Sequence, residues 1–143
     1  MTIEDTVRAL AEDLRELRRA VGPLLTAEQP LTAYGTWTPT LDLTTNVAAA
    51  TASAGYYIRV GNVVKAGVRL EIDVTAAAAT VLGISLPIAS AIGSVANVIG
   101  SGNSTTMGGE VRGHVAGDRA EFAYTSSVTA NTAFYIHFIY TII

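Results

Sequence analysis

The sequence predicts a mainly β protein in which an N-terminal α-helical coiled coil precedes a β-sandwich or barrel-like head domain. Three observations support this fold class: a heptad repeat over residues 3–25, a two-residue alternation after about residue 36, and glycine-rich turn signals at short spacing. A period near 3.5 is typical of coiled coils, and a period of two is typical of half-buried strands. We therefore divide the chain into a coiled-coil helix at residues 1–25, a linker at 26–35 and a β-rich head domain at 36–143.

The apolar residues of the predicted helix follow one another at intervals of four and three, as a and d positions do. This stripe is narrower than the face of a helix that packs on its own domain, so we expect parallel self-association. A trimer is favoured over a dimer, because Leu at an a position and Ile at a d position dilute the preference for two strands. Three heptads are marginal alone, so the head must help to hold the oligomer together. The expected oligomerisation residues are Ile3, Val7, Leu10, Leu14, Leu17, Val21 and Leu24 at a and d, with Asp13 at g and Arg18 at e.

Both ends of this helix carry local signals. Thr2 and Asp5 have the spacing of a capping box, with Asp in place of the usual Glu or Gln. Gly22-Pro23 weakens the last turn, so we expect the helix to end near there.

Strand signals dominate the head domain. From Val64 to Val74 the even positions are apolar and the odd ones polar or Gly. The segment from Phe134 to Ile143 is rich in aromatic and β-branched residues, and we interpret it as a buried strand. It is too short to cross a bilayer, which takes about 18 apolar residues, so no membrane insertion is expected.

Two hairpins can be predicted in detail. In GYYIRVGNVV, residues 55–64, we expect a three-residue loop at 60–62 that turns Tyr56 and Ile58 inward and leaves Tyr57 outside. In the second hairpin we expect a two-residue turn at Gly117-Asp118. That turn would pair Val115 with Ala120, Gly113 with Phe122, Val111 with Tyr124 and His114 with Glu121.

Composition excludes several classes of function. The formal net charge is −3, so the chain lacks the excess of basic residues that is typical of nucleic-acid-binding proteins. The chain has no cysteine, hence no thiolate metal site and no Cys nucleophile. Its first residues lack the basic and apolar regions of a secretory signal. Phosphate-loop, dinucleotide and serine-hydrolase motifs are missing from the sequence, so we expect no enzyme and no cofactor.

Few side chains remain as candidates for chemistry. His114 with Glu121 could form a general base, although a cross-strand charged pair on a solvent face is the favoured interpretation. His137 could meet its copies on a trimer axis around a metal, but one histidine per chain is a weak signal, and we assign no metal site. Glu71 and Asp73 share a face with two basic residues, which favours a solvated strand face over a glycosidase pair. The possible ligand or interface aromatics are Trp37 and Tyr57.

Three motifs in the head domain occur together in a recognisable order. They are GTWTPTL at residues 35–41, GYYIRVGNVV at 55–64 and ISLPI at 84–88. In this order the set resembles a β domain of bacteriophage virion surface proteins, such as tail fibres, head fibres and minor structural proteins. The resemblance spans about residues 35–90.

The resemblance implies a homotrimeric, non-enzymatic protein exposed on the virion, with no catalytic residues. Its expected location is the virion surface after synthesis in the host cytoplasm, and its expected partners are copies of itself and other capsid or tail proteins. We favour a capsid decoration protein or head fibre. The alternative is a short tail fibre that binds a host surface glycan or protein. A carbohydrate-binding module using Trp37 and Tyr57, and a depolymerase using Glu71 or Asp73, are weaker hypotheses.

Overall fold

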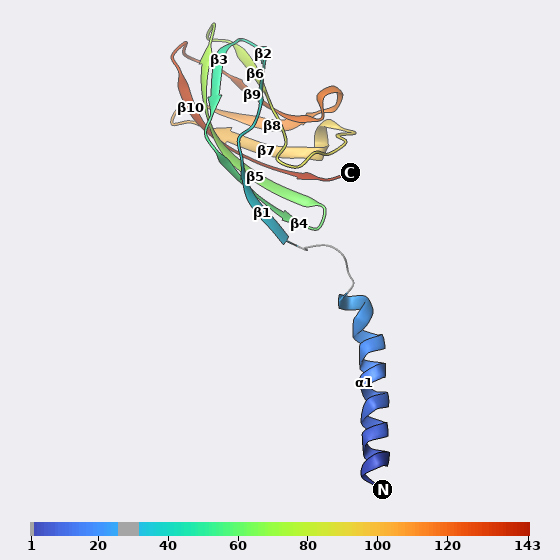
Figure 1. Cartoon of the computed structure of the whole chain (residues 1–143). Coiled ribbons are helices and arrows are strands. Elements are labelled where there is room, and N and C mark those ends of the chain that lie inside the picture. Colours follow the sequence, from blue (N-terminus) through green and yellow to red (C-terminus); the bar gives the residue numbers. More distant parts are fainter. Residues whose placement is uncertain (1, 26–31) are drawn as a thin grey trace. The chain divides into compact units, whose positions relative to one another are not determined.

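The computed structural model describes residues 2–25 and 32–143, with the side chains of 17, 18 and 20–25 left aside. The chain divides into two compact units, Met1–Pro30 and Leu31–Ile143, which are described separately below (Figure 1). The first holds one helix and the second is all β apart from two short 3-10 helices. A mainly β fold with one N-terminal helix is therefore confirmed.

Helix α1 spans Ile3–Leu25 and begins with the predicted capping box. The Thr2 backbone N–H donates to Asp5 Oδ2 at 3.0 Å, and the Asp5 N–H donates to Thr2 Oγ1 at 3.3 Å. The Thr2 hydroxyl also donates to Asp5 Oδ2 at 2.7 Å, and the hydrogen bonds from the backbone and then the hydroxyl of Thr2 lower the pKa of Asp5. The helix continues through Gly22 and Pro23, so the expected end near that pair is slightly early.

The second unit begins with a strand inside the range predicted as linker, because β1 starts at Thr32 rather than after residue 35. The strands are β1 (Thr32–Trp37), β2 (Leu41–Thr45), β3 (Val47–Ala52), β4 (Gly55–Val60), β5 (Val63–Val74), β6 (Ala79–Ile84), β7 (Val98–Asn103), β8 (Gly108–His114), β9 (Arg119–Thr125) and β10 (Thr132–Thr141), with 3-10 helices η1 (Val95–Asn97) and η2 (Val115–Gly117).

All strand pairs are antiparallel, and they form one sheet in the order β1-β4-β5-β10-β7-β8-β9-β6-β2. The long strand β5 has two neighbours along one edge: its first half pairs with β4 and its second half with β3. The sheet curls into a half-barrel, visible in Figure 1. The expectation of a sandwich or barrel-like head is thus refined to a single curled sheet.

The β2–β3 connection is tied to the β5–β6 connection by Asn46, which has a positive φ of 57°. Its side-chain nitrogen donates to the Ala76 carbonyl at 2.8 Å and to Thr80 Oγ1 at 2.9 Å. Its side-chain oxygen accepts from Thr75 Oγ1 at 2.6 Å and from the Ala76 N–H at 2.9 Å. With a longer bond to the Ala78 carbonyl at 3.4 Å, the Asn46 side chain makes five hydrogen bonds, which hold this corner of the half-barrel in place.

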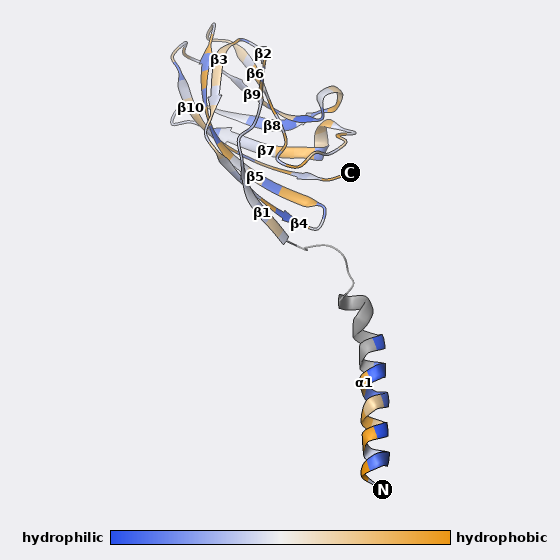
Figure 2. Cartoon of the chain, viewed as in Figure 1, coloured by the Kyte–Doolittle hydropathy of each residue, from blue (hydrophilic) through white to orange (hydrophobic). Residues whose placement is uncertain are grey.

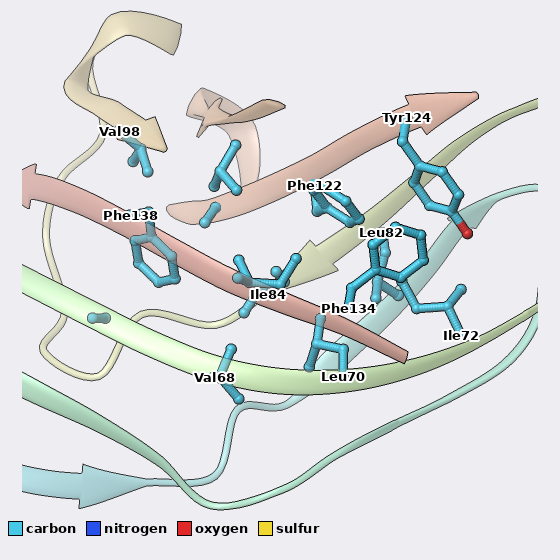
Figure 3. Packing of buried hydrophobic residues seen from close by; sticks show 14 of the residues in the cluster. Val68, Leu70, Ile72, Leu82, Ile84, Val98, Phe122, Tyr124, Phe134 and Phe138 are labelled. Carbon is cyan, nitrogen blue, oxygen red and sulfur yellow. The ribbon is translucent and has the colours of Figure 1, made fainter. Parts of the chain in front are cut away.

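The core fills the inner, concave face of the sheet (Figure 3). The ring of Phe134 on β10 lies 5.1 Å from that of Phe122 and 4.6 Å from that of Tyr124, both on β9. Strands β9 and β10 are not ladder neighbours, so these contacts exist because the sheet curls. The alternation predicted along β5 is confirmed: its buried apolar side chains are Val64, Ala66, Val68, Leu70, Ile72 and Val74.

Residues of the predicted ISLPI motif lie over one end of this core. The Tyr140 hydroxyl donates to the Ile88 carbonyl at 2.7 Å and accepts from the Ile88 N–H at 3.0 Å. Tyr140 is 2% exposed. Burial raises the pKa of Tyr140 to about 12. The loop after β6 is thereby fixed to the last strand.

The loop predicted in GYYIRVGNVV is wrong by one residue. The turn has two residues, Gly61 and Asn62, so Ile58 pairs with Lys65 and Val60 with Val63. Gly61 has a φ of 57°, which suits a glycine at the first turn position. Tyr56 and Ile58 therefore point outward. Tyr57 packs against the core, the reverse of the prediction. The error arises because the outward face of β4, with Tyr56, Ile58 and Val60, is more apolar than the inward one, so hydrophobicity indicates the wrong face as inner.

The second hairpin is correct in its faces and wrong in its register by two residues. Gly113 pairs with Ala120 and Val111 with Phe122, so the strands are linked by η2 and Asp118 rather than by a two-residue turn. Asp118 has a positive φ of 45° and accepts from the Ile92 N–H at 2.8 Å. A shift of two keeps the side chains of β8 and β9 on their predicted faces, whereas Val115 lies in η2 and is exposed.

Candidate functional site

One row of side chains crosses the outer, convex face of the sheet in continuous register. Each residue is the direct cross-strand partner of the next: Tyr34, Ile58, Lys65, Ile139, Ile99, Arg112, Glu121, Gly83 and Asp42. The first half of the row is apolar apart from Lys65, and the second half is charged apart from Gly83. The outer face therefore holds two chemically different surfaces.

The first surface, the outer apolar patch, lies on β1, β4, β5, β10 and β7. In Figure 2 the starts of β5 and β7 are coloured as hydrophobic. Direct cross-strand pairs join Tyr34 to Ile58, Val60 to Val63 and Ile139 to Ile99, and each member is between 42% and 86% exposed. The patch consists of Tyr34, Tyr56, Ile58, Val60, Val63, Ile99 and Ile139. Contiguous apolar surfaces of this kind mark interaction sites on soluble proteins.

Small residues shape this patch. Gly67 lies opposite Tyr56, and a Cβ atom at Gly67 would lie 2.7 Å from the Tyr56 ring. The ring therefore lies against bare backbone of β5. Beside it, Ile99 and Ile139 border a shallow depression of about 310 Å³ that also reaches His137 and Ser101. His137 is exposed and lies directly opposite Ser101.

The second surface, the charged cluster, lies on β2, β8 and β9. At its centre Glu121 is only 8% exposed, which is rare for a carboxylate. Its oxygens lie 3.8 Å from Arg112 Nε, 3.7 Å from an Arg119 terminal nitrogen and 3.8 Å from His114 Nε2. Arg119 also forms an ion pair with Asp42 on the edge strand. Asp42, Arg112, Arg119 and Glu121 thus compensate one another's charge, with His114 beside them.

Glycines allow this cluster to pack closely. A Cβ at Gly83 would lie 2.7 Å from Arg119 Nε, and a Cβ at Gly117 would lie 2.8 Å from His114 Nδ1. Those two nitrogens are buried and have no hydrogen-bond partner in the described chain. The predicted proximity of His114 and Glu121 is confirmed. The solvent-face interpretation is wrong for Glu121, because two arginines and the histidine cover it.

His114 and Glu121 are poorly arranged for general-base catalysis. Their 3.8 Å separation is longer than a hydrogen bond, and Glu121 is shared with two arginines. The sequence analysis missed Arg112, Arg119 and Asp42. Arg112 could have been found from the alternation of β8, whereas Asp42 becomes a neighbour through the sheet order alone.

The predicted ligand aromatics lie on the inner side of the sheet. Trp37 is partly buried, its indole Nε1 donates to the Ser85 carbonyl at 3.3 Å, and its ring meets Phe138 edge-on at 6.2 Å. Tyr57 is also packed against the core. Both side chains fill space inside the half-barrel rather than forming an exposed platform for a sugar.

The acidic pair on β5 lies in a solvated setting, as expected. Arg69 donates to Glu71 at 2.7 Å, and both side chains are about 40% exposed. This hydrogen bond, with a weaker one to Tyr135, raises the pKa of Arg69. Glu71 and Asp73 border a small depression with Ala50, Thr51 and Asn131.

The helical candidates form an exposed stripe where their side chains are described. Ile3 is 84% exposed, Leu10 is 69%, Val7 is 60% and Leu14 is 54%. Asp13 is exposed as well. The side chains of Leu17, Arg18, Val21 and Leu24 lie outside the described residues.

Comparisons with known proteins give no match to a protein family, to a curated protein or to a solved structure. Within residues 2–25 and 32–143 there is no group of three or more His, Cys, Asp or Glu placed to hold a metal ion. The described helices include none with the length and hydropathy needed to cross a membrane.

Proposed function

We propose that this protein is a non-enzymatic structural component of a bacteriophage particle. It forms a homotrimeric surface spike that serves as a capsid decoration protein or head fibre. Helix α1 joins three copies in a parallel coiled coil, and the half-barrel is the exposed head. The ordered motifs at residues 35–41, 55–64 and 84–88 support the virion assignment by their resemblance to phage surface proteins.

The observation that carries the proposal is the apolar stripe of α1. Ile3, Val7, Leu10 and Leu14 follow heptad spacing and are 54–84% exposed in the single chain. Burying such a stripe against copies of itself is the usual way in which a helix of this pattern gains stability. The inward positions of Trp37 and Tyr57 favour a structural role over sugar binding.

Light scattering on the full chain tests the trimer. Three chains of 14.9 kDa give a particle of about 45 kDa, as expected for a closed cyclic assembly. Leu14→Asp places a charge at an a position and should lower this mass to that of one chain. Arg15→Asp, at the neighbouring outward b position, is the matched control and should keep the assembled mass. A single-chain mass for the unaltered protein would refute the proposal.

Location on the particle tests the role. Antibody labelling of purified phage particles that carry the protein should place it over the capsid. Labelling confined to tail tips would refute the capsid assignment and indicate a short tail fibre.

A further inference from the structure

We infer that the outer apolar patch is the surface through which the heads of neighbouring copies bind one another. This inference rests on the proposed homotrimer and adds to it a second interface, distinct from α1. The patch has seven large apolar side chains on five adjacent strands, each at least 42% exposed in the single chain. Side chains in that number on one face indicate an interface that a single chain leaves open.

The covalent connection to α1 indicates that the partner bound at the outer apolar patch is another copy of this chain. Strand β1, which contributes Tyr34, starts seven residues after Leu25, the last residue of α1. A chain of that length reaches at most about 25 Å in any conformation. Helices that associate therefore keep the β1 strands of their heads close together, at high effective concentration.

The limited stability of a short coiled coil also indicates that the partner at the patch is a second copy. A coiled coil of three heptads is marginal alone, so the assembly needs further apolar contact from the rest of the chain. The outer apolar patch is made of the residue types that supply such contact, and it includes two tyrosines, which are enriched at interfaces. The depression beside Ile99 and Ile139 gives a side chain of the neighbouring head a place to enter.

Charge also favours contact at this patch. Each chain carries a net charge of −3, so two copies repel one another wherever acidic groups meet. The row from Tyr34 to Ile99 contains one charged residue, Lys65, and no carboxylate. Contact through the charged cluster would instead remove from water ion pairs that one chain already satisfies by itself.

Thiol labelling tests the inference directly. The chain has no cysteine, so a single substitution introduces one reactive thiol into the full-length protein. Tyr34→Cys and Ile99→Cys place the thiol in the patch. Val128→Cys places it on an exposed position in the β9–β10 loop, outside the patch, as the matched control.

In the assembled protein, the two patch thiols should react with a soluble disulfide reagent at least about tenfold more slowly than the control, because interface cores exclude solvent. Adding Leu14→Asp to each variant should restore fast reaction if the heads separate.

The outcomes separate this inference from the proposed function. An assembled mass with equally fast reaction at all three positions would overturn the head interface and leave the coiled coil standing. A single-chain mass would overturn both. Fast reaction in the free trimer with protection only in whole particles would show that a different virion protein binds the patch. That result would overturn the inference that a second copy binds there.

Discussion

The apolar and charged halves of the outer face lie on one continuous ladder and meet where Ile99 on β7 pairs with Arg112 on β8. The charged half is complete within one chain, since Glu121 is covered by its own arginines and Asp42 is paired with Arg119. The apolar half gains no comparable burial from its own chain. An outward position therefore does not by itself define the role of a surface. The role depends on whether side chains of the same chain pair or bury the groups on that surface.

The largest expected effect comes from breaking the charged half. Glu121→Ala leaves the arginines around a buried position with less compensating charge, so the free energy of unfolding should fall by about 2–3 kcal/mol. Glu110→Ala is the matched control, because Glu110 is exposed and 3.3 Å from the same Arg112. Its effect should stay within about 0.5 kcal/mol. Urea unfolding of the two variants measures the difference, and equal losses would show that Glu121 is not a structural centre.

Two neighbours on β7 sharpen the contrast between the two faces. Val98 is 1% exposed on the inner face and Ile99 is 63% exposed in the patch. Val98→Thr buries a hydroxyl group and should cost about 1–2 kcal/mol of unfolding free energy. Ile99→Thr should change the unfolding of the separated head by about 0.5 kcal/mol or less. Urea unfolding of both substitutions in a Leu14→Asp background provides the measurement. A large loss from Ile99→Thr would mean that the patch is part of the head's own core.

Tyr140, on the inner side of the apolar half, gives a test by pH. Its pKa is raised to about 12, so the folded state favours the protonated phenol. The resulting stability is complete below the unfolded value of about 10 and is lost as the pH rises toward about 12. Tyr140→Phe removes both hydrogen bonds to Ile88 and should cost about 1 kcal/mol at pH 7. The substitution should also reduce the loss of stability that occurs at alkaline pH. Thermal unfolding between pH 8 and about 11 checks this, and an unchanged alkaline slope would contradict it.

The smallest effect is expected at the start of α1, because the Asp5 side chain of the capping box is fully exposed to solvent. The pKa of Asp5 is lowered by its hydrogen bonds to Thr2. The stability that the charged carboxylate gives to the start of the helix is therefore present above the unfolded pKa and is lost as the pH falls through the folded value. Asp5→Ala should slightly reduce the helical signal in far-ultraviolet circular dichroism at pH 7 and have a smaller effect at pH 2. A reduction that is the same at both pH values would argue against the capping box.

Local patterns predicted much of this molecule. The alternation of β5 placed six residues in the core, and the Thr2–Asp5 spacing predicted the helix cap. The face of each side chain in the β8–β9 hairpin was also predictable, although its register was not, because η2 lengthens the turn by two residues.

Patterns failed where the environment depends on distant strands. In β4 the more apolar face, with Tyr56, Ile58 and Val60, is the outer one, so the predicted positions of Tyr56 and Tyr57 were exchanged. The charged cluster joins Asp42 to Arg119, which are 77 positions apart, and only the order of the sheet makes them neighbours. Both errors concern the outer face, where the alternation of apolar and polar residues gives no guidance.

The position of β10 has a consequence for biosynthesis. This strand is the last in chain order, yet it lies between β5 and β7 near the middle of the sheet, with partners along both edges. Until residues 132–141 leave the ribosome, strands β1, β4 and β5 have no ladder connection through it to β7, β8 and β9. The head can therefore complete its fold only after residues 132–141 have been synthesised, whereas α1 is made before any strand of the head. Premature termination before residue 132 would leave a head whose two groups of strands are not joined into one sheet.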